Sequence, residues 1–240
     1  MRVAVRRQGT VSASIYDLVR DLEPFRDIAE SEAQAVLAEA RLRTVEKGGQ
    51  IFAQGSAASR IFFLAAGRLK IVQASAEGHQ ILAHWVLPGQ FFGLAVAFGR
   101  EDYPGTALAV VESSALVWPI SAWARLSSEH PTVVTAALRM AGGHLQDAFA
   151  RLREAAGARV EQRVARALLR LARQSGCRTD DGVEIGFPVT RQDIADMTNA
   201  TLYTVSRTLS AWQQVGILAG GRRRVRIRDL DRLERLAGEE

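Results

Sequence analysis

The chain has 240 residues, a formal net charge of +5 at pH 7 and a single cysteine, Cys177. Hydrophobic residues make up 48% of it and charged residues 24%, which is typical of a globular protein and excludes a wholly disordered or collagen-like chain. One cysteine excludes a disulfide framework, a paired-cysteine redox site and a four-cysteine zinc or iron–sulfur site. The apolar runs are too short to span a membrane, and the N-terminus lacks the apolar block of a signal peptide, so we expect a soluble cytoplasmic protein.

The positive charge is concentrated near the C-terminus. Between Arg191 and Arg228 there are seven arginines, whereas the acids are only Asp193 and Asp196, so this stretch carries as much net charge as the whole chain. A local concentration of this kind suggests a polyanionic partner such as nucleic acid. A solvated basic face is the alternative.

The N-terminal part predicts a tail followed by helices. Residues 1–14 are polar, basic and aperiodic, which indicates a flexible tail. Residues 15–45 have helical character, and Pro24 divides them into two pieces. Ser31 is predicted to cap the second piece, with Leu37 and Leu42 on one side of it.

The pattern changes between Thr44 and Val117, where glycines recur between short apolar segments such as RIFFLAAG and QILAHWV. Short strands separated by turn residues at this spacing predict an antiparallel sandwich or barrel. Gly78 suits a hairpin turn between two of these strands because glycine adopts positive φ without strain.

A helical period begins at Pro131. Apolar residues follow one another at alternating separations of four and three, which is a heptad pattern, although Gly142 and Gly143 weaken the helix locally. The helix could lie on its own sheet, but three heptads favour a partner helix from a second copy of the chain. The predicted dimerisation seam consists of Val134, Leu138, Ala141, Leu145, Ala148, Leu152 and Ala155.

A second helix is predicted after Gly157, where we place the domain boundary. Its apolar residues recur at helical spacing from Val160 to Leu171, with arginines opposite, and it ends at Ser175 and Gly176. The following segment DDGVEIGFPV predicts a short hairpin. Its adjacent acids, Asp180 and Asp181, suit a turn better than acid–base catalysis.

Residues 190–218, TRQDIADMTNATLYTVSRTLSAWQQVGIL, have the pattern of a helix-turn-helix. Thr190 is predicted to cap the first helix, with Asp193 three residues later at its positive end. Asn199 tolerates the positive φ that such a turn often requires. Thr201 is predicted to cap the second helix, which buries Leu202, Val205 and Leu209 and exposes Tyr203, Thr204, Ser206 and Arg207 on the side from which a recognition helix reads bases.

The segment GILAGGRRRVRIRDL predicts a two-stranded wing after this motif. Gly220 and Gly221 would form its turn, and Val225 and Ile227 would point inward. The arginines would then face outward, where DNA phosphates lie. The predicted phosphate contacts are Arg222, Arg223, Arg224 and Arg226.

Over nearly its full length the chain resembles the Crp/Fnr family of transcription regulators. The segments FFLAAGRLKI, HWVLPGQFFGLAVAFG and TALAVVESSALVWPI resemble the family's β-roll sensor, and VEQRVARALLRLA with TRQDIADMTNATLYTVSRTL resembles its DNA-binding domain. The resemblance implies an α+β fold. Its parts would be a β-roll sensor domain at 15–130, a dimerisation helix at 131–157 and a winged helix-turn-helix domain at 158–240.

The resemblance also implies partners and contacts. A homodimer would bind a palindromic operator in double-stranded DNA and contact RNA polymerase. Tyr203, Ser206 and Arg207 would face bases, whereas the DNA backbone would be contacted by Thr190, Arg191, Thr201 and Thr204. Family members commonly carry glutamate where Tyr203 stands, so the usual half-site preference is in doubt.

The sensed signal is less well defined. Leu94 and Gly105 stand where cyclic-nucleotide-binding relatives carry a glutamate and an arginine, which argues against cAMP. The cysteine cluster of oxygen-sensing relatives is absent, so we expect no iron–sulfur cluster. Resembling members act in nitrogen-oxide or low-oxygen responses, which makes such a signal the expectation here.

Haem stays open as an alternative cofactor. We expect the histidines to lie at the surface and the lone cysteine to be inert, although Arg178 could lower the pKa of the Cys177 thiol. The candidate ligands are His79, His84, His130, His144, Met140 and Cys177. No sequence motif of catalysis is present, so the chain is not expected to be an enzyme. The alternatives are a haem-based gas sensor and a ligand-binding module that does not bind DNA.

Overall fold

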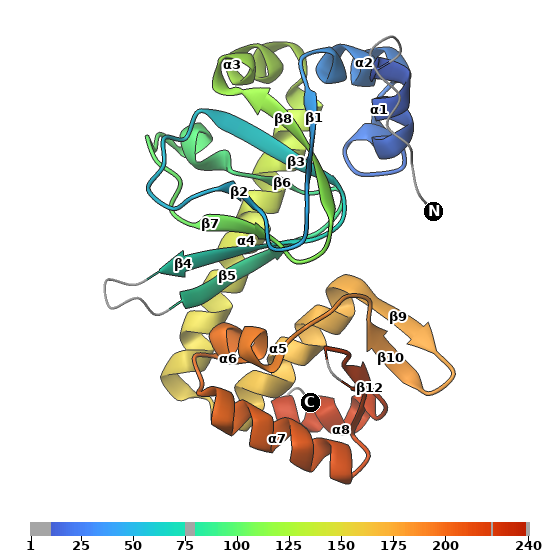
Figure 1. Ribbon diagram of the computed structural model, residues 1–240, viewed down its shortest axis with the longest axis vertical. Coiled ribbons are helices and arrows are strands. Elements are labelled where there is room, and N and C mark those ends of the chain that lie inside the picture. Colours follow the sequence, from blue (N-terminus) through green and yellow to red (C-terminus); the bar gives the residue numbers. More distant parts are fainter. Residues whose placement is uncertain (1–10, 75–79, 222, 239–240) are drawn as a thin grey trace. The chain divides into compact units, whose positions relative to one another are not determined.

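The computed structural model describes residues 11–74, 80–221 and 223–238 (Figure 1). It divides into two compact units. The N-terminal unit runs to Gln73 and includes His84–His144, and the C-terminal unit comprises Ala74–Ala83 and Leu145–Glu240. The hairpin turn predicted at Gly78, together with His79 and Arg222, lies outside the described residues.

The N-terminal part of the fold contains two antiparallel four-stranded sheets, in the orders β1-β8-β3-β6 and β2-β7-β4-β5. Glycine-rich turns separate the strands, as the spacing predicted. The strands are β1 (Arg41–Val45), β2 (Gln50–Phe52), β3 (Arg60–Ala66), β4 (Leu69–Ala74), β5 (Gln80–Val86), β6 (Phe91–Phe92), β7 (Thr106–Ala109) and β8 (Ser113–Pro119). A β-roll therefore confirms the predicted α+β class.

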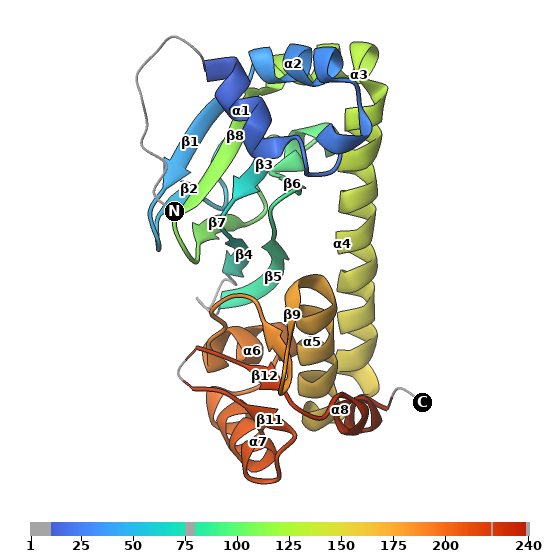
Figure 2. The ribbon, with the colours of Figure 1, turned by 90° about the vertical axis from the view of Figure 1, so that its right-hand side faces the viewer.

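Helices cover one end of this unit, where α1, α2 and α3 gather in Figure 2. They are α1 (Val11–Val19), the 3₁₀ turn η1 (Phe25–Asp27), α2 (Glu30–Ala38) and α3 (Ile120–Glu129). Buried aromatic rings join them to the sheet: Phe25 lies edge-on to Phe63, and the Trp118 indole N–H donates to the Val36 carbonyl at 2.9 Å. These contacts fix the positions of η1 and α2 on the sheet.

Three details of the N-terminal prediction are wrong. Helix α1 begins at Val11, inside the stretch assigned to a tail, and α2 begins at Glu30 without a side-chain cap, so Ser31 does not start it. Residues 41–45 form strand β1, because five consecutive residues pair with β8 and this pairing overrides the local helical character. Leu42 therefore lies on a strand and is partly exposed.

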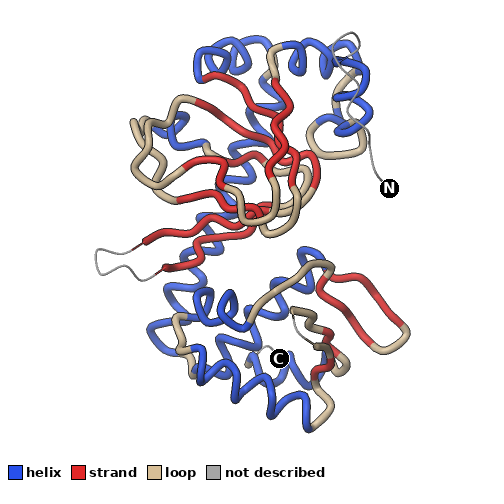
Figure 3. Tube along the Cα trace, in the orientation of Figure 1, coloured by secondary structure: helices blue, strands red, loops and turns tan. Residues whose placement is uncertain are grey.

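The C-terminal unit contains the helices α5 (Val160–Ser175), α6 (Arg191–Thr198), α7 (Leu202–Gln214) and α8 (Leu230–Ala237). The preceding helix, α4 (Pro131–Gly157), continues from the N-terminal unit into this one. Strands β9 (Gly176–Thr179), β10 (Gly182–Ile185), β11 (Leu218–Ala219) and β12 (Arg226–Ile227) form a sheet in the order β11-β12-β10-β9 (Figure 3). The wing, β11 to β12, is thus joined to the β9–β10 hairpin, whose turn holds Asp180 and Asp181 as predicted.

The turn between α6 and α7 depends on Asn199, which adopts φ +47° and ψ +51°. The left-handed conformation ends α6 and lets the chain reverse into the Thr201 cap of α7. Arg163 on α5 donates to the carbonyls on either side of this reversal, at 2.9 Å to Thr198 and 3.4 Å to Asn199. These bonds satisfy oxygens that have no partner inside the helix.

Substitution of Asn199 tests this requirement. Asn199→Val should lower the free energy of unfolding of the C-terminal unit by about 1–2 kcal/mol, because a β-branched side chain is strained at positive φ. Asn199→Gly is the matched control and should stay within about 0.5 kcal/mol of the parent. Urea unfolding followed by circular dichroism measures both. Equal losses for valine and glycine would show that the side-chain amide, and not the backbone conformation, is what matters.

Candidate DNA-binding surface and effector cavity

The N-terminus of α6 has the predicted cap. The Thr190 hydroxyl accepts from the Asp193 amide at 3.0 Å, and the Asp193 carboxylate accepts from the Thr190 amide at 2.9 Å. This reciprocal pair is a capping box, and it fixes the entry of the chain into α6. Ile194 and Ala195 are buried beneath it as expected.

Helix α7 presents a polar, solvent-facing side. Thr201 caps it by accepting from the Thr204 amide at 3.1 Å, and Val205 and Leu209 are buried. Tyr203 is 75% exposed and Arg207 is exposed, whereas Thr204 and Ser206 are half-buried. Leu202 differs from the prediction because it is 47% exposed; it occupies the first turn, outside the packed face.

Arg191 bridges the two helices of the motif. Its guanidinium donates to the Ser206 carbonyl at 3.4 Å and to the Ser210 hydroxyl at 3.2 Å. The side chain therefore lies along α7 and is held next to the residues predicted to face bases. Because these bonds already hold the side chain, Arg191 would lose less conformational entropy on binding a phosphate.

A groove of 570 Å³ separates the start of α6 from the wing. Thr190 and Arg191 line one side of it, and Arg223 and Arg224 line the other. The helix N-terminus contributes a partial positive charge to the same space. The groove thus combines backbone donors with two exposed wing arginines, which is chemistry that suits a phosphate.

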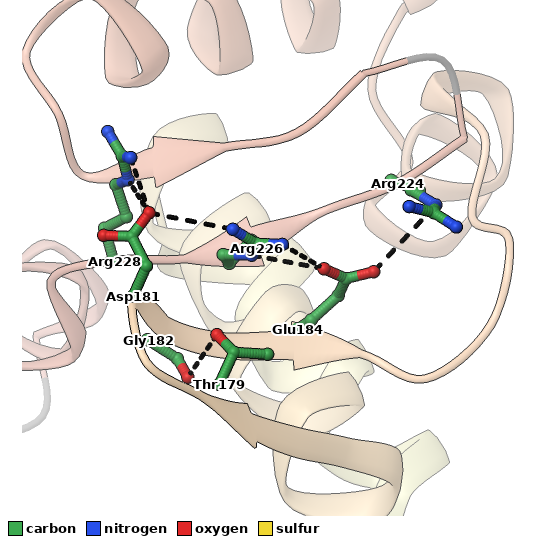
Figure 4. A network of polar contacts seen from close by, with 7 residues as sticks. All are labelled: Thr179, Asp181, Gly182, Glu184, Arg224, Arg226 and Arg228. Carbon is green, nitrogen blue, oxygen red and sulfur yellow. Dashed lines mark hydrogen bonds and ion pairs between the residues drawn. The ribbon is translucent and has the colours of Figure 1, made fainter.

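The wing arginines are not equivalent, as Figure 4 shows. Arg226 donates to Glu184 on β10 at 2.7 and 3.2 Å and lies 3.7 Å from Asp181. Arg228 donates twice to Asp181, at 2.7 and 2.5 Å. Arg224 reaches Glu184 at 4.0 Å only, with 78% of its side chain exposed.

This network changes the expectation for Arg226. The alternation of the wing sequence predicted an outward-facing guanidinium, but the Arg226 side chain is only 33% exposed and its partner Glu184 only 23%. The hydrogen bond from Arg226 lowers the pKa of the Glu184 carboxyl, and the same bond raises the pKa of Arg226. Both groups are therefore charged at neutral pH, and their ion pair connects the wing to the β9–β10 hairpin.

Helix α4 carries a row of exposed apolar side chains. Within the predicted seam, Leu138, Leu145, Ala148, Leu152 and Ala155 are exposed, and Leu152 reaches 67%. Val134 and Ala141 are half-buried because they pack against the core of the N-terminal unit. Phe149 is also 56% exposed and was missed, although its position four residues after Leu145 was a usable signal.

The N-terminal unit contains a cavity of 250 Å³, here called the sensor cavity. Its walls come from the two sheets, the 3₁₀ turn η2 (Leu94–Phe98) and α4. His84 and His144 stack in its wall with ring centroids 4.1 Å apart, so neither is the isolated surface histidine that was expected. No sequence signal joins residues so far apart in the chain.

The residues of the sensor cavity do not fit haem well. Pockets for drug-sized ligands measure about 300–1,000 Å³, and haem is larger than such ligands. His84 and His144 are the candidate ligands that line the cavity, but their rings face each other. Of the other candidates, His130 lies 3.4 Å from Glu32, Met140 accepts from the Phe91 amide, and Cys177 is exposed on β9. Among the described residues, no group of three His, Cys, Asp or Glu side chains could hold a metal ion.

The described helices also include none with the length and apolar character of a membrane span.

The Glu184–Arg226 pair predicts a pH dependence of stability. Because the folded-state pKa of Glu184 is lowered, its contribution is present above the unfolded pKa of about 4.3 and is lost as the pH falls through the folded pKa. Glu184→Gln should therefore lower the melting temperature at pH 7 and flatten its decline in acid. Glu161→Gln, at an exposed position on α5, is the control. An unchanged acid profile in Glu184→Gln would contradict this role.

Comparison with known proteins agrees with this geometry. Residues 42–130 match the family model of the cyclic nucleotide-binding domain, and residues 162–236 match that of the Crp-like helix-turn-helix domain. The chain is 30% identical over 220 residues to the nitrogen fixation regulation protein FixK of Azorhizobium caulinodans, covering 89% of this chain and 88% of that protein. It is 27% identical to the transcriptional activator protein FnrA of Stutzerimonas stutzeri, covering 82% and 81%.

A solved structure shares the fold. FixK2 from Bradyrhizobium japonicum superposes with a TM-score of 0.71 at 25% identity, covering 82% of this chain and 96% of that one. These relatives are transcription regulators and not enzymes. The chain belongs to the Crp/Fnr family and is a DNA-binding transcription regulator, with a sensor domain of the cyclic-nucleotide-binding type joined to a winged helix-turn-helix.

Proposed function

We propose that this regulator binds a palindromic operator as a homodimer and that its sensor domain controls the binding. The observation that carries the DNA contact is the exposed side of α7. Tyr203 and Arg207 project from its first two turns, while Val205 and Leu209 hold the opposite side in the core. This is the part of a recognition helix that enters the major groove.

Individual residues have separate roles in this proposal. Tyr203, Ser206 and Arg207 face base edges, and Arg207 can donate two hydrogen bonds to a guanine. The DNA backbone is held by Thr190, Arg191, Thr201, Thr204, Arg223 and Arg224, around the groove between α6 and the wing. Arg226 acts indirectly, because its guanidinium is bound to Glu184 and keeps the wing in position.

The proposed dimer uses the exposed row on α4. Leu138, Leu145 and Leu152 recur every seven residues, which is the spacing of a helix–helix seam. Large apolar side chains in a continuous row are costly in water and favour association. Two copies related by a two-fold axis would present their recognition helices about 34 Å apart, one turn of DNA.

The domain boundary near Gly157, the contact with RNA polymerase and the nitrogen-oxide or low-oxygen signal stay predictions.

The DNA contact is tested by selecting bound sequences from a random pool and measuring affinity for the selected operator. Arg207→Ala should reduce the preference for that operator over random DNA by about 1–3 kcal/mol, because the bidentate base contact is lost. Arg224→Ala is the matched control: it should weaken all sequences alike and lower the salt slope by about one. Loss of sequence preference in the Arg224 variant would contradict this division.

Tyr203 is tested in the same selection. Tyr203→Glu should shift one base pair in each half-site towards cytosine on the contacted strand, since a carboxylate accepts from cytosine N4. If both proteins select the same sequence, Tyr203 does not read bases.

The seam is tested by Leu145→Asp, which would bury a charge between the two copies. Sedimentation velocity should show a monomer, because the unpaired buried charge costs several kcal/mol, on the order of 3–5. Gln146→Asp adds the same charge one residue away, at an exposed position outside the seam, and should remain a dimer. A dimer in both variants would place the interface elsewhere.

A further inference from the structure

We propose that the sensor cavity binds a small, uncharged aromatic molecule as the effector. The regulatory effect of that molecule rests on the proposed function, but its binding to the sensor domain does not. The proposal follows from the size of the cavity, from the chemistry of its wall and from the construction of its mouth.

The size of the cavity selects a small occupant. An apolar protein cavity of about 150 Å³ holds benzene, and drug-sized ligands need about 300 Å³ or more. At 250 Å³ the sensor cavity lies between these values. It therefore fits a molecule of about one or two fused rings, and it is small for a nucleotide with base, sugar and phosphate.

The wall is made largely of aromatic faces and aliphatic side chains. Phe52 and Tyr103 stack at 4.0 Å with their planes 16° apart, and Phe92 stacks on Phe62 behind the wall at 5.1 Å. The Tyr103 hydroxyl donates to the Arg60 carbonyl at 2.7 Å, and burial raises the pKa of this phenol. The uncharged ring of Tyr103 thus forms part of the wall, and planar aromatic ligands pack well on the faces of aromatic rings.

The charge on the wall is already balanced. Arg100 donates to Asp102 at 2.8 Å, so its guanidinium has a carboxylate partner at the rim. No acidic side chain is among the described residues that line the cavity. A cation brought into this wall would lose its hydration without meeting a carboxylate, and an anion would have to compete with Asp102 for Arg100, whereas an uncharged ring loses little.

Two positions of the wall, Leu94 and Gly105, lack the charged or polar groups that a cyclic nucleotide would need. Leu94 is buried and adds aliphatic surface to the wall. At Gly105 a Cβ atom would lie 3.0 Å from both the Ile71 methyl and the Val72 carbonyl, so a longer side chain would require these neighbours to shift. The wall therefore has no cation at Gly105 for a cyclic phosphate and no acceptor at Leu94 for a ribose hydroxyl.

One exposed aromatic ring lies at the edge of the cavity. Phe98 lines the cavity yet is 56% exposed, and it ends the η2 turn. Glycines in the left-handed conformation flank this turn, Gly93 at φ +68° and Gly99 at φ +74°. Position 93 also requires glycine for steric reasons, because a Cβ atom there would come within 2.7 Å of the Phe62 ring. Because exposed side chains change rotamer readily, rotation of Phe98 would let a flat molecule enter without a change in the sheets.

The test is fluorine NMR with 5-fluoroindole and the full chain, in the absence of DNA. The probe signal should broaden and shift on binding, and unlabelled indole should displace it while cAMP should not. Ala95→Leu fills the cavity from η2 and should weaken binding about tenfold or more, and Phe98→Ala removes one ring from the wall and should weaken it about threefold. Leu42→Ala removes another exposed apolar side chain from β1, outside the cavity, and should leave binding unchanged.

The outcomes separate this proposal from the proposed function. Absence of binding up to the solubility limit of the probe overturns it, as does equal displacement by cAMP. Binding that is insensitive to both Ala95→Leu and Phe98→Ala also overturns it, because the probe would then lie elsewhere. If Ala95→Leu fails to fold, the exposed Phe98 still decides the location. A protein that binds 5-fluoroindole but enriches no sequence from the random pool would refute the DNA proposal alone.

Discussion

One guanidinium, that of Arg163, connects the parts of the C-terminal unit on which DNA recognition depends. It donates to the Ala158 carbonyl at 2.8 Å, just after α4, and to the carbonyls at the reversal between α6 and α7. The rigid fork of arginine can serve three acceptors in fixed directions, which the point charge of lysine cannot. The direction of α7, and with it the placement of Tyr203 and Arg207, follows from this contact and from the backbone of Asn199.

Helix α4 serves two purposes within a few residues. Ala141 and His144 face the sensor cavity, and Leu145, the next residue, belongs to the exposed seam. Adjacent positions on a helix point about 100° apart, so one turn can contribute to a ligand site and to an interface at once. In the proposed dimer, a molecule that shifts His144 would therefore act on the same turn that carries the seam, and no long path would be required between the two.

Predictions from the sequence were most accurate where a residue's role depends only on its near neighbours in the chain. Thr190, Thr201 and Asn199 were placed correctly because capping and left-handed backbone depend on their own side chains and on near neighbours. Contacts between distant segments could not be predicted. The β1 pairing, the stack of His84 on His144 and the bond from Arg226 to Glu184 join residues 42 or more positions apart. Only the folded chain brings such residues together. The sequence therefore did not predict the cavity or the pairing of Arg226 with Glu184.

The row of charges in Figure 4 shows that the arginines of the wing overstate its net positive charge. Arg224, Arg226 and Arg228 alternate with Asp181 and Glu184, so three arginines supply little more than one net positive charge. Ions condensed on DNA are released in proportion to the cations that reach phosphates, and an arginine that keeps its carboxylate releases none. The affinity of this wing should accordingly vary less steeply with salt than its run of arginines suggests. In the proposed complex, selectivity for an operator would then depend mainly on the contacts of α7 with the bases.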